Sequence, residues 1–231
     1  MKIIWLGHGS FRFEIGEVVL LLDPWLTGNP MLPEDSHDAA ISGATHILLT
    51  HAHFDHSVDA VALAKKLGVP VLGQYDLMGY WGETQGIETV GFNKGGTIDL
   101  GGGVRVSMVN AEHSSTFSTP DGLRTGGSEA GYMIHAEGKT IYCSGDTDIM
   151  ADMEWMGDYY KPEIGILSAG GHFTMDMAKV AYAAKRYFDF KTLIPAHYRT
   201  FPLLEQSAET LVAALPEVDV IEPQVLQAIE V

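Results

Sequence analysis

Apolar runs broken by glycine and by an Asp-Pro pair dominate the first part of the chain. Runs of this kind favour short β-strands that end in tight turns. We expect strands over residues 2–7, 10–16 and 17–24. The stretch 24–43 is rich in Pro, Gly, Asn and Asp, so it predicts a long loop, and long loops in compact domains often carry function.

The next part mixes strand and helix patterns. Residues 57–68 show helical periodicity, with a serine at the start and Gly68 at the end. Residues 75–86 predict a second, shorter helix. The apolar runs between and after these helices predict strands at 45–50, 69–73, 87–91, 97–100 and 104–109.

The second half repeats this pattern. Residues 131–138 and 139–146 predict a hairpin that turns at Glu137-Gly138. Helices are expected at 152–162, at 174–188 with Thr174 as N-cap, and at 207–216; strands are expected at 163–170, 191–197 and 218–223. Two sheets that face each other, with helices outside, would bury this pattern well. The expected class is therefore α/β.

Composition narrows the function classes. The 231 residues suit one sizeable domain or two fused halves, and the net charge of −16 disfavours nucleic-acid binding. The single cysteine, Cys143, excludes a disulfide framework and fits a reducing compartment. No signal-peptide core and no apolar stretch long enough to span a membrane occurs. We expect a cytoplasmic protein with no membrane partner.

Four ligand-type side chains follow one apolar run. His51, His53, Asp55 and His56 lie within six positions. In an extended segment, side chains at i and i+2 point the same way, so His51 and His53 can converge on one point. Separate structural partners for three such histidines would be a coincidence, and imidazole and carboxylate are natural ligands for divalent transition metals. The segment predicts a metal site.

One loop is too cramped to supply a whole coordination shell. Three further ligand-type residues, His113, Asp146 and His197, each follow another predicted strand. A site on one rim of a two-sheet sandwich would collect its groups from such positions. Each residue alone is a weak signal, but their shared placement strengthens the prediction.

The segment "THAHFDH" resembles the HxHxDH signature of the metallo-β-lactamase superfamily. "AEHSS", "SGDTD" and "PAHY" are similar to its later ligand motifs, in the same order, and Asp23 resembles the residue of its first motif. "LGHGSF", "LLDPWLTGNP", "GGHFTM" and "HYRTFP" look like the small stand-alone metal-dependent hydrolases related to the ascorbate-phosphate lactonases. The resemblance runs from about residue 1 to residue 202.

This resemblance implies an αββα sandwich of two mixed β-sheets flanked by helices, formed by residues 1–231 as one domain, with a two-metal centre. His51, His53 and His113 would hold one ion; Asp55, His56 and His197 would hold the other. Asp146 would bridge the two ions, and Asp23 would orient the ligand loop. Zinc is the first expectation, and manganese, iron and nickel suit the same ligands. The common zinc β-lactamases place a cysteine where Asp146 falls, which argues against antibiotic hydrolysis.

The chemistry expected of two such ions is hydrolysis. Ions about 3.5–4 Å apart would ionise a bridging water near neutral pH, and the resulting hydroxide would attack a lactone, a phosphodiester or a thioester. Asp55 would orient that nucleophile or carry its proton, or act only as a ligand. The alternative is an iron-dependent redox enzyme with the same ligands.

Three residues remain as candidate substrate or ligand-supporting groups: His8, His172 and Arg199. His8 and His172 lie in loops that the resemblance places near the metals. Arg199, two residues past His197, could face an anionic small-molecule substrate. The sequence is compatible with a homo-oligomer.

Overall fold

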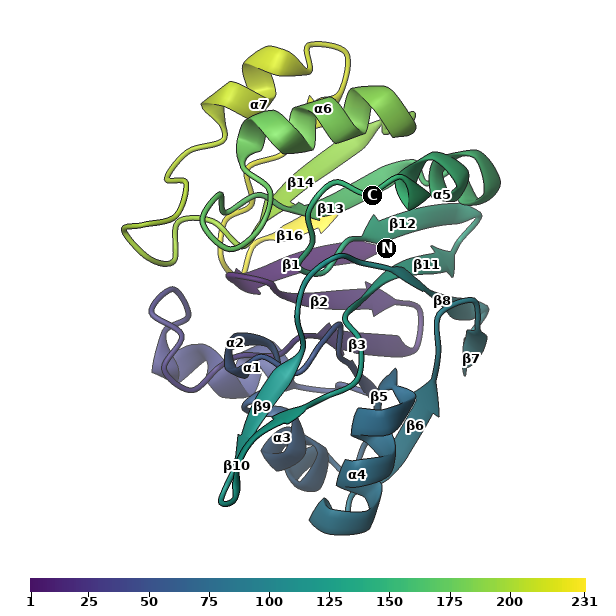
Figure 1. The fold of residues 1–231 in the computed structure, drawn as a ribbon, viewed down its shortest axis with the longest axis vertical. Helices are drawn as coiled ribbons and strands as arrows, with labels where there is room; N and C mark the ends of the chain where they lie inside the picture. Colours follow the sequence, from purple (N-terminus) through teal and green to yellow (C-terminus); the bar gives the residue numbers. More distant parts are fainter.

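Two seven-stranded sheets pack face to face, and helices cover their outer faces (Figure 1). The computed structural model describes residues 1–231. In spatial order, the first sheet consists of β16 (Ala228–Glu230), β1 (Lys2–Gly7), β2 (Ser10–Ile15), β3 (Val18–Leu22), β4 (His46–Leu48), β5 (Val71–Gln74) and β6 (Thr89–Phe92). The second consists of β15 (Asp219–Val220), β14 (Thr192–Ala196), β13 (Ile164–Ser168), β12 (Lys139–Cys143), β11 (Ala130–Ala136), β8 (Val104–Asn110) and β7 (Thr97–Gly101).

The helices divide between the two outer faces. Those next to the first sheet are α1 (His37–Ile41), α2 (Phe54–Ser57), α3 (Ala60–Leu67) and α4 (Tyr75–Gln85). Those next to the second are α5 (Asp152–Tyr160), α6 (Met177–Tyr187) and α7 (Glu209–Ala214). The expected αββα sandwich of two mixed sheets is confirmed. No helix combines the length and the apolar character needed to cross a membrane.

Alternating side chains explain the layers. Leu20 and Leu22 of β3 belong to a core cluster of 46 buried residues, most of it between the sheets, whereas Leu21 belongs to a cluster of 17 under the first sheet's helices. Ile47 and Leu48 of β4 divide in the same way. A strand buried on both faces needs apolar residues at successive positions. This is why these strands appear as unbroken apolar runs.

Several local expectations are confirmed and one is wrong. The β11–β12 hairpin turns at Glu137 and Gly138, both of which have positive φ. Helix α6 is capped by Asp176, whose carboxylate accepts the Lys179 N–H at 2.7 Å; Thr174 is not the cap. The Thr174 hydroxyl instead accepts the Gly170 N–H. The predicted cap is therefore two residues too early.

Other differences concern short elements. The loop 24–43 contains a 3₁₀ turn, η1 (Glu34–Ser36), and α1. The helix expected at 57–68 is α3, and the short helix α2 precedes it. A two-stranded hairpin of β9 (Thr116–Thr119) and β10 (Gly122–Thr125) stands apart from both sheets and was not predicted. Strand β16, which pairs with β1, was also not predicted. These segments are too short for a periodic pattern to show.

Candidate metal centre

Six strands deliver polar side chains to one edge of the sandwich. Strands β1, β3 and β4 run parallel to one another in the first sheet, as do β8, β12 and β14 in the second. Their carboxyl ends therefore meet at one rim. The residues that follow them are His8, Asp23, His51, His113, Asp146 and His197. Helix α2 begins after His53 and carries Asp55 and His56 to the same place.

The first group of ligand atoms comes from His51, His53 and His113. One nitrogen of each lies within 4.8 Å of the others. His51 Nε2 and His53 Nδ1 are 3.0 Å apart, as the i and i+2 spacing predicts. Ring nitrogens from three chain positions thus converge on one point, which suits a cation that accepts nitrogen ligands.

Asp23 fixes the orientation of two of these rings. Its carboxylate accepts the Thr50 N–H and O–H at 2.7 and 2.6 Å and the His56 Nδ1–H at 2.8 Å. Since the Thr50 hydroxyl donates to Asp23, it accepts from His51 Nδ1–H at 2.9 Å. Both His51 and His56 therefore direct Nδ1–H away from the centre and turn Nε2 toward it. A carboxylate behind a ligating histidine has this effect in metal sites.

The second group contains His8, Asp55, His56 and His197, again with ligand atoms within 4.8 Å of one another. Asp55 Oδ2 lies 2.9 Å from His8 Nε2 and 3.7 Å from His197 Nε2. Burial lowers the pKa of His8 to about 4, so its ring is neutral and carries a single N–H. A carboxylate can only accept, so His8 Nε2–H donates to Asp55, and Nδ1 accepts from the Thr200 hydroxyl at 2.8 Å.

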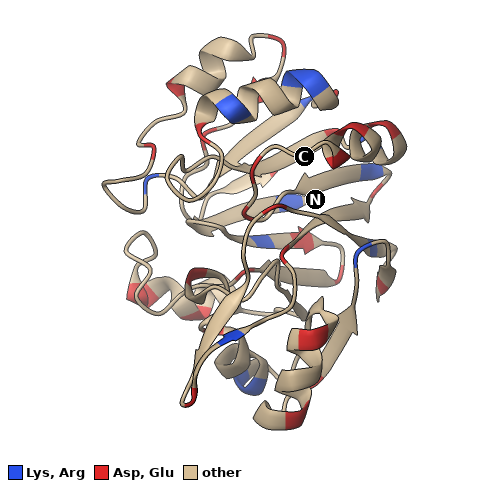
Figure 2. Ribbon diagram, in the orientation of Figure 1, with Lys and Arg blue, Asp and Glu red and all other residues tan.

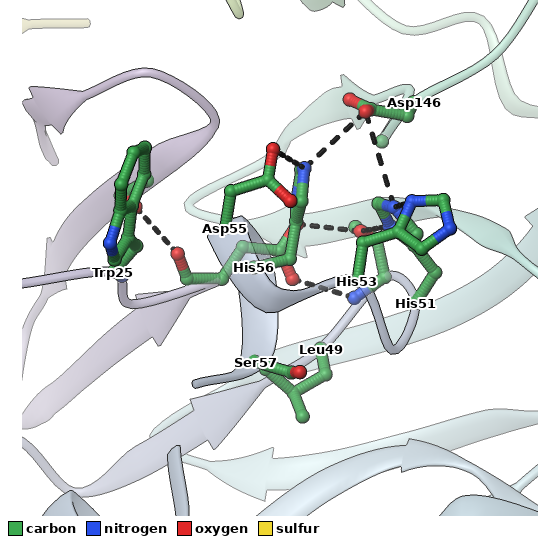
Figure 3. A network of polar contacts seen from close by, with 12 residues as sticks. Trp25, Leu49, His51, His53, Asp55, His56, Ser57 and Asp146 are labelled. Carbon is green, nitrogen blue, oxygen red and sulfur yellow. Dashed lines mark hydrogen bonds and ion pairs between the residues drawn. The ribbon is translucent and has the colours of Figure 1, made fainter. Parts of the chain in front are cut away.

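A single oxygen of Asp146 touches both groups. Its Oδ2 lies 3.0 Å from His197 Nε2, 3.4 Å from His56 Nε2, 3.7 Å from His113 Nε2 and 4.0 Å from His51 Nε2. Figure 3 shows this carboxylate pointing at His51 and His56, with Asp55 beside His56. The buried His56 Nε2 has no hydrogen-bond partner. These nitrogens and oxygens fit divalent cations as ligands, and seven side chains are available to hold them.

Charges in the centre are balanced between carboxylates and imidazoles. Burial lowers the pKa of His51, His53 and His113 and keeps these rings neutral. Burial also disfavours charge on His197, but Asp146 outweighs it and raises the pKa of His197 to about 9. Asp146 and Asp23 similarly raise the pKa of His56 well above its usual value. Burial would raise the pKa of Asp146, yet His197 and His56 hold it far below its normal value. The protein alone thus keeps protons where cations could bind.

Two sequence candidates lie elsewhere. A cavity opens over the centre, and neither His172 nor Arg199 lines it. His172 is exposed and borders a separate shallow hollow with Asp176 and Glu205. The Arg199 guanidinium lies over the Tyr198 ring, 5.8 Å from its centre. Neither residue therefore faces this cavity, and the cavity gives no support to the expectation that they meet an anionic substrate.

Three supporting residues were not found from the sequence. Thr50 connects His51 to Asp23, and Thr200 accompanies His8. Asp59 accepts the Leu26 and Thr27 N–H groups at 2.7 and 2.8 Å and so ties the loop after β3 to helix α3. Thr50 directly precedes the HxHxDH motif, and this position could have identified it from the sequence. No sequence pattern distinguishes Thr200 and Asp59 from other polar residues, and only the folded structure shows their hydrogen-bond partners.

Known proteins resemble this chain in sequence and in fold. Residues 19–198 match a family model described as the beta-lactamase superfamily domain. A UPF0173 metal-dependent hydrolase of Ruegeria pomeroyi is 76% identical over 231 residues, the full length of both chains, and one of Ruegeria sp. is 74% identical over 230 residues, 100% of each chain. The solved structure of a metallo hydrolase from the archaeon Ignicoccus hospitalis aligns with a TM-score of 0.82 at 29% identity, covering 99% of this chain and 97% of that one.

Proposed function

Since the chain belongs to the beta-lactamase superfamily and is a metal-dependent hydrolase, we propose that it holds two divalent transition-metal ions and hydrolyses a small ester-like substrate there. The candidate reactions are the opening of a lactone and the cleavage of a phosphodiester or thioester. Zinc is the first candidate metal, and manganese, iron and nickel suit the same nitrogen and oxygen ligands.

The position of Asp146 carries this proposal. One of its oxygens lies within 4.0 Å of four imidazole nitrogens, two from each group of ligands. A carboxylate so placed can contact ions on both sides. His51, His53 and His113 would hold the first ion, and Asp55, His56 and His197 the second. His8 would hold none, because its Nε2–H is already donated to Asp55.

A pair of bound ions supplies Lewis acidity and lowers the pKa of a shared water. The chain's own residues do the rest. Asp23 and Thr50 hold His51 and His56 with their Nε2 atoms inward. His8 holds the Asp55 carboxylate in one orientation, from which Asp55 can orient the attacking water or accept its proton.

The test combines elemental analysis with a substrate panel. Purified protein should contain up to about two transition-metal ions per chain and should hydrolyse at least one lactone, phosphodiester or thioester in a metal-dependent way. His51→Ala and His53→Ala should lose metal and all hydrolysis. Asp146→Ala should weaken both ions together, whereas His197→Ala should chiefly empty the second site. Unchanged metal content in Asp146→Ala would contradict the bridging role.

The competing reaction class has its own outcome in this experiment. A protein that contains two ions, hydrolyses none of the three substrate classes, and instead consumes oxygen or peroxide when loaded with iron would be a redox enzyme. Hydrolysis that stops with chelator, returns with metal and rises with pH near neutrality supports the hydrolase.

A further inference from the structure

The cavity over the metal centre is large, and its carboxylates and histidines lie at one end. Its volume is about 880 Å³, which is in the range of pockets that hold small organic ligands. The side chains of His53, Asp55, His113, Asp146 and His197 lie at its inner end. A substrate that reaches these groups must leave the rest of its body in the outer part of the cavity.

Apolar side chains from four segments build the outer part. Phe54 and Val58 come from helix α2 and the residue after it. Phe117 of the β9–β10 hairpin packs against Tyr80 and Trp81 of helix α4, with ring centres 5.4 and 6.4 Å apart. The opposite wall is formed by Phe173 and by the loop after β14, from Phe201 to Leu203. Figure 1 shows this hairpin projecting from the body beside α3 and α4.

Exposed apolar residues concentrate around this cavity. Phe54, Val58, Leu123, Phe173 and Leu203 are all large apolar side chains between 52% and 76% exposed, and all five line it. Single exposed apolar residues are ordinary, but a group around one cavity marks a surface that is covered when a ligand binds. Contact of these apolar side chains with water is unfavourable, and an apolar ligand that buried them would gain this free energy on binding.

The charge of the lining argues for the same kind of ligand. No lysine or arginine lines the cavity, while Asp55 and Asp146 lie at its inner end. Arg124 of the hairpin lies over the Tyr80 ring. The whole chain has a net charge of −16, and acidic residues far outnumber basic ones in Figure 2. A negatively charged substrate body would find no cationic partner in the outer cavity and would be repelled by the surrounding field.

We infer that the outer cavity binds the uncharged, apolar acyl group of a carboxylic ester whose carbonyl lies at the histidine end. This inference rests on the proposed hydrolase function and specifies its substrate class. In the reaction, the oxygen of water forms a bond to the carbonyl carbon and the bond from that carbon to the alcohol oxygen breaks. One proton of the water passes to the departing alcohol, and the acid product releases the other.

The first experiment compares ester chains on the metal-loaded protein. With p-nitrophenyl esters from acetate to decanoate, kcat/KM should rise by up to about fourfold per added methylene until the cavity is filled. Mono-p-nitrophenyl adipate, which carries a carboxylate at the end of a six-carbon acyl chain, should react at least about tenfold more slowly than p-nitrophenyl hexanoate. A flat dependence on chain length, or equal rates for these two six-carbon esters, would overturn the inference.

A variant pair tests the location. Leu203→Lys places a cation on the cavity wall at an exposed position, so it should lower kcat/KM for the hexanoate and raise the adipate-to-hexanoate ratio about tenfold or more. Val212→Lys on helix α7 makes the same change at an exposed position outside the cavity and should leave the ratio unchanged. Equal ratios in the two variants would refute this location.

A binding measurement separates the two proposals. The neutral dye N-phenyl-1-naphthylamine should bind the metal-free protein saturably, and Leu203→Lys should weaken its binding several-fold while Val212→Lys does not. Dye binding of this kind in a protein that hydrolyses no carboxylic ester, lactone, phosphodiester or thioester would support the apolar site and contradict the proposed function. Metal-dependent ester hydrolysis without such dye binding would support the function and contradict the apolar site.

Discussion

Asp23 is the residue on which the histidine orientations depend. It accepts one hydrogen bond from His56 and two from Thr50, and through Thr50 it determines the ring orientation of His51. The sequence identifies Asp23 only through its resemblance to a family motif. The structure adds the physical reason, which is that a buried acceptor leaves each Nε2 free for a cation.

Asp23→Asn should therefore weaken metal binding. An amide in this place turns two donors toward the Thr50 hydroxyl and His56, so His56 would lose the proton on Nδ1 and keep the one on Nε2. We expect a loss of about 10–100-fold in metal affinity, measured by competition with a chelator, and a loss of about 1–3 kcal/mol in the free energy of unfolding of the metal-free protein.

Asp59→Asn is the matched control. Asp59 is also buried and accepts two backbone N–H groups, but it touches no candidate ligand histidine. It should cost stability and leave metal affinity within about twofold of the unmutated protein. If both variants lost metal affinity equally, the role assigned to Asp23 would be wrong.

His8 has a different role from the other histidines of the centre. Its Nε2–H holds Asp55, and its ring lies 3.7 Å from that of His197, centre to centre. His8→Ala should lower kcat about 10–100-fold and leave two metal ions in place, because the carboxylate loses its orientation but the ligands remain. Elemental analysis and steady-state kinetics would check this, with His135→Ala as a histidine variant outside the centre. Loss of an ion in His8→Ala would make His8 a ligand.

At the scale of elements, the sequence predicts the strand ends but not how closely they pack. Gly170 follows β13 and lies against the end of β14: a methyl group on Gly170 would lie 2.3 Å from the His197 carbonyl oxygen and 2.9 Å from its Nδ1. The backbone of His197 cannot move away without shifting the ligand. Gly170→Ala should lower activity more than about tenfold and cost about 1–3 kcal/mol in the free energy of unfolding.

Gly79→Ala provides the comparison for that measurement. Gly79 lies in helix α4, and a methyl group there would meet nothing within 4 Å. This change should leave activity unaltered and stabilise the protein by up to about 1 kcal/mol. Denaturant unfolding and initial rates on both variants would check the pair. Normal activity in Gly170→Ala would show that the strand ends are not tightly packed.

The clarity of the hydrophobic pattern explains which elements the sequence predicts. Buried strands such as β3 and β4 are apolar on both faces, and α6 has a clear apolar stripe. The sequence pattern therefore predicts these elements. Strands β9 and β10 have exposed or half-buried residues and no such pattern. The candidate metal ligands are predictable because they lie in the HxHxDH motif or soon after a strong strand. The apolar cavity is not predictable, since its walls come from segments that approach one another only in the folded chain.

For the whole molecule, metal loading should be coupled to protons. The metal-free centre holds three buried or partly buried carboxylates, Asp23, Asp55 and Asp146, against the imidazoles of His56 and His197. The pKa of His197 is raised to about 9 and that of His56 also stands well above 6.5, so both rings carry a proton at pH 7. A cation needs the neutral ring, and binding must displace these protons.

Isothermal titration of metal-free protein with zinc, in buffers of different ionisation enthalpy, should therefore show release of up to about two protons per chain at pH 7. Proton release should fall as the pH rises through about 9, where His197 is already neutral.

The pH dependence of the stability of the metal-free protein follows from the same pKa. A raised histidine pKa stabilises the folded state below pH 6.5, and this contribution is lost as the pH rises through about 9. The Tm of the metal-free protein should decline over that interval, and the metal-loaded protein should not share this decline, because a bound cation replaces the protons. Zinc binding at pH 7 without proton release would show that these histidines are not the ligands.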